Sequence, residues 1–388
     1  MSVNAAEPRL REGLRDVVVV FLVARLLLFG LSAVTGGLLL PPPPGQPTTD
    51  SGYPAPALEP GWHMLFTATE RQDGLWFLRL GTQGYSGDDA SAAFFPLYPV
   101  LVRTVSWLPL VGPLGAALLV SNVSFFAALL VLHALTRREL GARAAPRALR
   151  FVALFPTAFF FLAPYSESLF LLLSVSAFWF ARRERWALAG AAAAAAALTR
   201  SVGAVLILAL AVEAVRQWRG EGRAPLPRLA GAAAAAAGPL LYLGWWQVRF
   251  GDFWAPLDAQ RAWRPDGPAE PIGVLVDAVR LAWEHQTWWL IDLAVVAMAI
   301  AGIVLVARRI PLTYTVYAAA SLLLPLLFPL NGRPLMSMPR FVAVLFPAAW
   351  GFARLAERRP RAGDAILLGA AAGYGILVTL FVNWLYIF

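Results

Sequence analysis

The stretch "DVVVVFLVARLLLFGLSAVTGGLLL", residues 16–40, decides the fold. It stays apolar over a length that crosses a bilayer core of roughly 30 Å, which takes about 20 helical residues. The run is too long for the core of a signal peptide, and it lacks a clear small-residue cleavage site. We therefore interpret it as a retained first membrane span.

The composition extends this interpretation to the whole chain. Of its 388 residues, 59% are hydrophobic and only 14% are charged, whereas soluble domains carry about 25% charged residues. Several further apolar runs follow the first one, so the sequence predicts an all-α polytopic membrane protein. The chain has no cysteine, which excludes disulfides and thiolate–metal sites.

The arginines indicate how the chain is threaded. All 32 basic residues are arginine, and most lie in short clusters between apolar runs. Basic clusters at alternate loops are the positive-inside pattern, so the net charge of +9 does not indicate a nucleic-acid partner. With the clusters in the cytoplasm, inner loops hold 21 arginines and outer segments hold 10, and the N-terminus is cytoplasmic.

This threading predicts one transmembrane domain over residues 1–388 with about eleven spans and two large outer segments. The outer segments are 41–110, with a catalytic loop and interface helices, and 249–286, which ends in a helix on the membrane surface. Alanine tracts at 191–197 and 232–237 predict close helix packing. The expected spans are 16–40, 111–135, 148–163, 168–181, 186–198, 202–215, 229–248, 287–307, 311–330, 341–355 and 364–386.

Two charged residues occupy the outer tips of short spans. Glu167 follows the span at 148–163, and Arg200 follows the span at 186–198. A charge at membrane depth is costly unless it is paired or hydrated, so it marks a functional site by default. The alternative is that Glu167 and Arg200 only pair with each other for packing.

Other unusual residues share the predicted outer face. They include Asp73 within "ERQDGLWFLRLGTQGY" (70–85), the prolines of "FFPLYP" (94–99), which can open a short helix, and "RPLMSMPRF" (333–341). One acid and several arginines at a membrane surface suit a substrate that is half lipid and half anionic headgroup.

These segments resemble a known family. "RQDGLWFLRLGTQGYSGDDASAAFFPLYPVLVR", "FPTAFFFLAPYSESLFLLLS", "LAGAAAAAAALTRSVG" and "MPRF" are similar to successive blocks of the GPI mannosyltransferase 2 (PIG-V type) family and its bacterial relatives, within the GT-C superfamily. The resemblance covers residues 70–341. It departs at Gln72, where the family usually has tryptophan.

The resemblance implies an inverting transfer of mannose from a polyprenyl-phosphate donor on the outer face, with Asp73 as the general base. A positioned carboxylate takes the proton of the acceptor hydroxyl, and cationic donors stabilise the leaving phosphate. Arginine suits phosphate because its donors form a planar fork. We rank the phosphate ligands Arg200, Arg340 and Arg333, and we expect a substrate pocket that contains Glu167, Tyr165, Arg71, Tyr98 and Tyr85.

The family's monophosphate-linked donors imply that no metal or other cofactor is needed. Asp88 and Asp89 form a carboxylate pair of the kind that binds hard cations, but we interpret them as the start of a helix. His63 and His285 lack the spacing of a metal motif.

Three alternatives remain open at this stage. A transporter or flippase of a lipid-linked or anionic solute also needs intramembrane charge, but it predicts related halves, and none is evident. A non-catalytic scaffold subunit would tolerate the loss of Asp73. A related enzyme would use another lipid-phosphate sugar, such as arabinofuranose, glucose or galactose.

Two further expectations concern the acceptor and the location of the protein. We expect the acceptor to be a glycolipid, glycan or protein hydroxyl. The all-arginine, alanine-rich chain indicates a bacterial plasma membrane.

Overall fold

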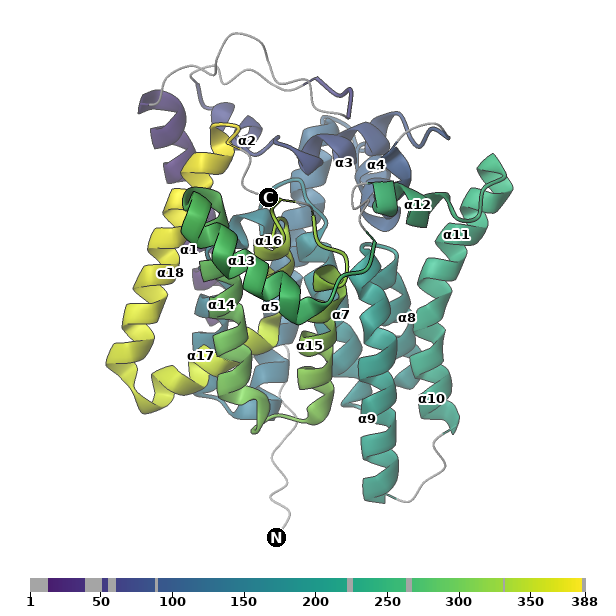
Figure 1. Cartoon of the computed structure of the whole chain (residues 1–388), viewed down its shortest axis with the longest axis vertical. Helices are drawn as coiled ribbons and strands as arrows, with labels where there is room; N and C mark the ends of the chain where they lie inside the picture. Colours follow the sequence, from purple (N-terminus) through teal and green to yellow (C-terminus); the bar gives the residue numbers. More distant parts are fainter. Residues whose placement is uncertain are drawn as a thin grey trace.

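The computed structural model describes residues 13–38, 51–54, 61–87, 90–221, 226–262, 267–330 and 332–385. Within these ranges every regular element is a helix (Figure 1). Six helical stretches are long and apolar enough to cross a membrane. They are α1 (Leu14–Leu38), α5 (Pro113–Leu140), η4 (Ser201–Ala204) with α9 (Val205–Glu221), α10 (Leu226–Ala233) to α11 (Ala237–Phe250) through η5 (Ala234–Ala236), α14 (Thr287–Ala307) and α18 (Pro360–Val382).

Three shorter apolar helices complete this set among the described residues. They are α7 (Glu167–Ala181), α8 (Trp186–Ala197) and α15 (Leu312–Leu326). The predicted all-α polytopic fold is thus confirmed, and nine of the eleven predicted spans correspond to these stretches.

The other two predicted spans are broken helices. In place of 148–163 the chain forms α6 (Ala144–Ala153) and, after Pro156, the short η3 (Ala158–Phe161). In place of 341–355 it forms α16 (Met338–Ala343) and α17 (Phe346–Arg358), with a proline in the first turn of each. Proline lacks the N–H that would continue a helix, which is why these apolar runs are interrupted.

The two breaks lie against each other inside the protein. The hydroxyl of Thr157, which is fully buried, donates a 2.7 Å hydrogen bond to the carbonyl oxygen of Pro339. Irregular backbone within a membrane protein persists only where protein or trapped water satisfies its polar groups. The breaks are therefore built into the fold. Glu167 follows the first break, and Arg340 lies in α16, just before the second.

Small residues let the helices approach closely, as the alanine tracts predict. A Cβ at Gly190 of α8 would lie 2.3 Å from the carbonyl oxygen of Gly231 in α10. A Cβ at Gly351 of α17 would lie 1.7 Å from the carbonyl oxygen of Gly302 in α14. Neither glycine can be replaced without moving a neighbouring helix, which is the small-residue packing typical of helices in lipid.

Short helices cover one end of the bundle, the upper end in Figure 1. We call it the site end. Here α13 (Pro271–His285) has exposed apolar side chains, Trp283 among them, opposite a buried face of Val274, Ala278 and Ala282. A helix was predicted there, although the membrane position of α13 stays a prediction. The site-end helices are α2 (Met64–Thr67), α3 (Asp73–Thr82), η2 (Ala90–Ala93), α4 (Leu97–Val105), α12 (Ala255–Ala262) and α13 (Pro271–His285).

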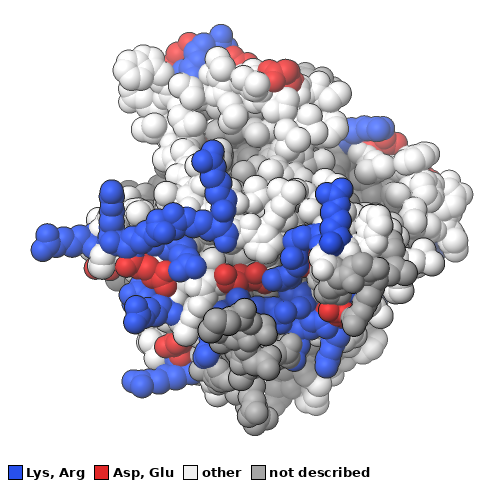
Figure 2. Space-filling view, turned by 90° about the horizontal axis from the view of Figure 1, so that it is seen from below, with Lys and Arg blue, Asp and Glu red and all other residues white. Residues whose placement is uncertain are grey.

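The opposite end, which we call the arginine-rich end, carries most of the basic clusters. The turns that join α14 to α15 and α17 to α18 lie there, as do the adjoining ends of α9 and α10 (Figure 1). Viewed from below, basic side chains spread across this face (Figure 2). This end therefore gathers the basic clusters that the arginine pattern places on one side of a membrane.

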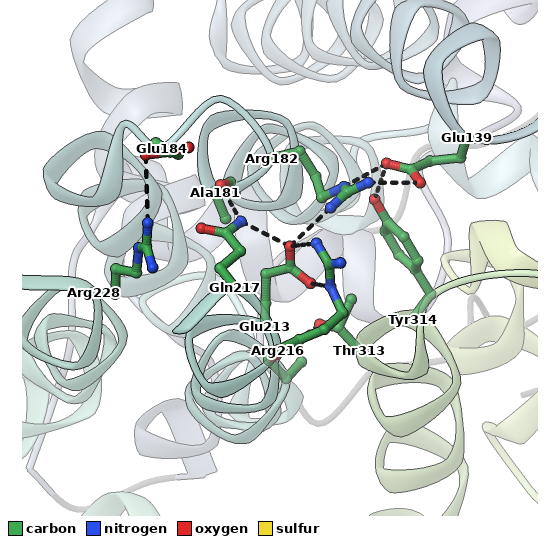
Figure 3. A network of polar contacts seen from close by, with 11 residues as sticks. Glu139, Ala181, Arg182, Glu184, Glu213, Arg216, Gln217, Arg228, Thr313 and Tyr314 are labelled. Carbon is green, nitrogen blue, oxygen red and sulfur yellow. Dashed lines mark hydrogen bonds and ion pairs between the residues drawn. The ribbon is translucent and has the colours of Figure 1, made fainter. Parts of the chain in front are cut away.

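A buried polar network ties four helices together at this arginine-rich end (Figure 3). Arg182, just after α7, donates to Glu139 of α5 at 2.6 Å and to Glu213 of α9 at 3.0 Å. Tyr314 of α15 donates to the same Glu139 carboxylate at 3.0 Å. Because α7 and α9 both begin at the site end, this network holds together the far ends of the helices that bring Glu167 and Arg200 into the site.

Candidate active site

Four charged side chains from distant parts of the sequence meet at the site end. Asp73 opens α3, Glu167 opens α7, Arg200 precedes η4 and Arg340 lies in α16. Arg340 links the two acids: its NH1 atom lies 2.5 Å from Asp73 Oδ2, and its Nε atom lies 3.0 Å from Glu167 Oε1. Arg200 forms an ion pair with the same Glu167 oxygen. We call these four residues the charge cluster.

Local backbone geometry brings Asp73 to this place. Gln72 has a φ of 50°, which turns the chain sharply before α3 begins. A Cβ at Gly74 would lie 3.2 Å from the side chains of Pro164 and Tyr165, so the missing side chain lets the start of α3 pack against the "PYSES" segment. A carboxylate in the first helical turn is also favoured by the helix dipole.

The "PYSES" segment is held from both sides. The hydroxyl of Tyr165 donates to the carbonyl oxygen of Arg71 at 2.8 Å, and Ser121 of α5 donates to the carbonyl oxygen of Tyr165 at 3.1 Å. Glu167 is fully buried, and its Oε2 atom has no hydrogen-bond partner among the described residues. The predicted tip therefore forms a buried wall beneath α3.

An aromatic ring lies beside the two arginines of the charge cluster. The guanidinium carbons of Arg200 and Arg340 lie 4.9 Å and 5.5 Å from the centre of the Phe341 ring. Arg340 also lies 5.7 Å from the ring centre of Tyr165. Such contacts stabilise a cation by about 0.5–2 kcal/mol. Burial opposes the charged form of Arg340, but Asp73 and Glu167 outweigh it and raise its pKa.

The four side chains of the charge cluster differ in how far they are exposed to solvent. The side chain of Asp73 is 17% exposed, those of Arg340 and Arg200 are 14% and 10% exposed, and Glu167 is not exposed. Asp73 binds Arg340 through Oδ2, and its other oxygen has no hydrogen bond to the described part of the chain. The arrangement thus provides an oriented carboxylate oxygen that can accept a proton, next to two cations that can bind an anion.

The structure brings five of the nine predicted site residues together. Tyr165 joins the charge cluster through its ring contact with Arg340, and the alternative pairing of Glu167 with Arg200 is present as part of this larger group. Arg333 instead holds the buried Asp292 of α14 through two contacts of 2.7 and 2.9 Å. Its role as a phosphate ligand stays a prediction.

Arg71 ties the start of α3 to the end of α18. Its guanidinium donates to the carbonyl oxygens of Val382, Glu70 and Thr67, and it lies 4.8 Å from the ring centre of Trp384. Its side chain is fully buried, and burial lowers its pKa to about 10. These contacts give Arg71 a structural role, and its assignment to the substrate pocket stays a prediction.

Two predicted tyrosines also have structural partners. Tyr98 is fully buried and bonds to Ser121 at 2.8 Å and to the carbonyl oxygen of Ala117 at 3.1 Å. Tyr85 donates to the carbonyl oxygen of Phe94 and packs among the aromatic side chains of α11. Neither tyrosine has a contact with the charge cluster among these interactions, so their assignment to the substrate pocket stays a prediction.

Glu70 is a site-end acid that sequence reasoning missed. It is only 8% exposed, and burial raises its pKa from 4.5 to about 7, with Arg71 partly opposing the shift. Its position three residues before Asp73 was the available signal, but a glutamate in a loop is ordinarily solvated. Phe341 was likewise quoted only as the end of "MPRF".

Replacement of Glu70 is expected to stabilise the protein at high pH. A carboxyl group whose pKa is higher in the folded than in the unfolded state costs stability as pH rises from about 4.5 to 7. The shift corresponds to about 3 kcal/mol above pH 7. Thermal unfolding in detergent should therefore show Glu70→Gln more stable than wild type at pH 8, with most of that difference gone near pH 5.

The matched control for this measurement is Glu284→Gln, at a glutamate of α13 whose side chain is 51% exposed. It is expected to unfold like the wild type at both pH values. A Glu70→Gln variant whose unfolding temperature differs from wild type equally at pH 5 and pH 8 would contradict the assignment.

The histidines and carboxylates that could suggest a metal site lie apart or have other contacts, and the expectation that no metal is needed stays a prediction. Among the described residues, no group of three His, Cys, Asp or Glu side chains gathers in a way that could hold an ion. The ring centres of His285 and Trp289 lie 4.7 Å apart in a tilted contact, and His63 packs beside Trp62. Asp88 and Asp89 lie outside the described residues.

Comparison with known proteins gives a family and a fold. A family model described as "Mannosyltransferase (PIG-V)" matches residues 15–217, which include Asp73, Glu167 and Arg200. No curated protein matches the chain.

Among solved structures, the chain is similar to ArnT from Cupriavidus metallidurans bound to undecaprenyl phosphate. The TM-score is 0.54 at 14% identity, over 95% of this chain and 76% of ArnT. The apo state of ArnT gives a TM-score of 0.51 at 15% identity, over the same 95% and 76% of the two chains. An oligosaccharyltransferase from Archaeoglobus fulgidus is also similar, with a TM-score of 0.47 at 14% identity, over 94% of this chain and 53% of that one. At such identity the likeness shows the fold alone, which is the GT-C fold.

Proposed function

The chain belongs to the mannosyltransferase (PIG-V) family, and from this premise we propose that it transfers mannose from a polyprenyl-phosphate donor to a hydroxyl group, with Asp73 as the general base. A glycosyltransferase of the GT-C class is what the family and the fold support directly. The observation that carries the finer proposal is the charge cluster, in which the most exposed acid is held by an arginine.

The proposed reaction is a single displacement. Asp73 takes the proton from the acceptor hydroxyl as its oxygen attacks the anomeric carbon of the sugar. The bond from that carbon to the phosphate oxygen breaks on the opposite face, and the polyprenyl phosphate leaves with the electron pair. The sugar ends on the acceptor oxygen with inverted configuration, and the proton stays on Asp73 until solvent removes it.

Arg340 and Arg200 are the proposed ligands of the donor phosphate. Arg340 contacts Asp73, so a phosphate bound to its free N–H groups would lie close to the base. Guanidinium groups bind phosphate in a fixed geometry and carry full charge at any relevant pH. Fixed cations that face the leaving group stabilise the negative charge that develops there. The buried Glu167 holds both arginines in place.

The charge asymmetry of the molecule supports an outer-face site. The arginine-rich end fits the cytoplasmic side by the positive-inside rule, which leaves the charge cluster facing outward. The GT-C fold of a protein solved with undecaprenyl phosphate supports a lipid-phosphate donor. We therefore place the protein in a bacterial plasma membrane, with a glycolipid, a glycan or a protein hydroxyl as acceptor.

A donor and acceptor screen tests this function. Purified protein in nanodiscs is incubated with polyprenyl-phosphate-linked mannose, glucose, galactose or arabinofuranose and with a bacterial envelope extract. We expect release of polyprenyl phosphate and a hexose-sized mass gain on an acceptor, strongest with mannose. A nucleotide-linked mannose that serves as donor in place of the lipid-linked sugar would contradict the proposal.

Chelation of divalent cations is expected to leave the rate unchanged. The charge cluster offers arginines for the leaving phosphate, so no metal ion is needed for that task. The same transfer assay with and without EDTA measures this. A rate that falls about tenfold or more with EDTA and returns with added magnesium would contradict the metal-free mechanism.

A further inference from the structure

A second basic site lies at the arginine-rich end, away from the charge cluster. Here the end of α5, the start of α6 and the last turns of α17 border an open hollow of about 690 Å³. This volume falls within the range of small-molecule sites, about 300–1,000 Å³. The hollow is lined by Leu140, Gly141, Ala142, Arg143, Arg147, Arg354 and Glu357.

The lining of the hollow has a net positive charge, because it contains three arginines and one glutamate. Glu357 pairs with Arg354 at 2.8 Å. Arg147 donates to the carbonyl oxygen of Arg143 at 2.7 Å, and within the described part of the chain neither Arg143 nor Arg147 contacts a carboxylate. Two of the three guanidinium groups are therefore free to bind an anion.

An unsatisfied donor points the same way. The Nε atom of Arg354 is buried and has no hydrogen-bond partner within the described part of the chain. A buried N–H group without a partner is costly, and an unseen water or ion is one explanation for such a group. An anion in this hollow would balance the charge of Arg143 and Arg147 and lie close to Arg354, which lines the same hollow.

We propose that this hollow binds a phosphate group at the arginine-rich face. Guanidinium groups bind phosphate oxygens in pairs and at short distance. The group comes from an anionic phospholipid headgroup or from a soluble phosphate ester, since both present the same chemistry. The site does not depend on the proposed sugar transfer.

Binding of short-chain phosphatidylglycerol, glycerol 3-phosphate and inorganic phosphate to the purified full chain tests the proposal. Native mass spectrometry and titration should show one phosphate-bearing ligand per chain in the wild type. Arg143→Gln/Arg147→Gln should weaken that binding about tenfold or more, because each hydrogen bond from a charged group contributes strongly to the binding free energy. Arg147→Lys keeps the charge and should retain part of the affinity.

The control is Arg358→Gln/Arg359→Gln, which removes the same charge from exposed positions outside the hollow. It should bind like the wild type. Binding of the lipid alone assigns the site to a membrane headgroup, and binding of the soluble phosphates assigns it to a soluble ester. Equal affinity in the wild type and Arg143→Gln/Arg147→Gln, or an equal loss in the control, would overturn the proposal.

Discussion

Asp73→Asn is expected to lower the rate of sugar transfer by about 10²- to 10⁴-fold, the range that a positioned general base contributes. The amide of asparagine has nearly the shape of the carboxylate but cannot take the acceptor proton. Arg340 keeps its contact with Glu167 at 3.0 Å, so the variant should still fold. Initial rates with lipid-linked mannose measure the effect.

Asp277→Asn provides the matched control, because Asp277 is exposed on α13 and pairs only with Arg280 among the described residues. It should transfer sugar at the wild-type rate. Size-exclusion profiles and unfolding temperatures establish that the variants are equally folded. If Asp73→Asn keeps more than about a tenth of the wild-type rate, Asp73 is not the base, and the scaffold alternative gains support.

Glu167→Leu is expected to destabilise the protein by about 3–5 kcal/mol, the usual cost of removing one partner from a buried ion pair. Glu167 is fully buried and contacts both Arg200 and Arg340. Its loss leaves two nearby cations with Asp73 as their remaining partner in the charge cluster. Thermal or denaturant unfolding in detergent measures the loss.

A double variant separates charge balance from packing. Glu167→Leu/Arg200→Leu removes both members of a pair, and replacing both with apolar side chains is often close to neutral. It should recover a large part of the lost stability. Glu284→Leu, at an exposed glutamate, should change stability by less than about 0.5 kcal/mol. If the double variant is less stable than Glu167→Leu, the ion pair does not explain the burial of Glu167.

The long apolar runs were sufficient to predict most of the fold. A helix that crosses lipid must be both long and apolar, so length and hydropathy identify it without tertiary information. The two broken spans were wrong as continuous helices for a physical reason. By hydropathy, residues 148–163 form one continuous apolar run, but Pro156 interrupts the helix. The broken backbone is stabilised because Thr157 donates a hydrogen bond to the carbonyl oxygen of Pro339.

The charge cluster could be predicted in part. Asp73, Glu167, Arg200 and Arg340 are charges at positions where a membrane protein seldom keeps them, so they stood out. Their neighbours were harder to assign, because partner choice is set by packing. Nothing in the sequence says that Arg333 binds Asp292 or that Arg71 binds the carbonyl of Val382, 311 residues away.

The stereochemistry of the product tests the central claim most directly. Wild-type protein is given lipid-linked mannose of known anomeric configuration, and the transferred sugar is analysed by NMR. With Asp73 as the base of a single displacement, the anomeric centre must be inverted in the product. Retention of configuration, or no transfer from any polyprenyl-phosphate sugar, would contradict the account.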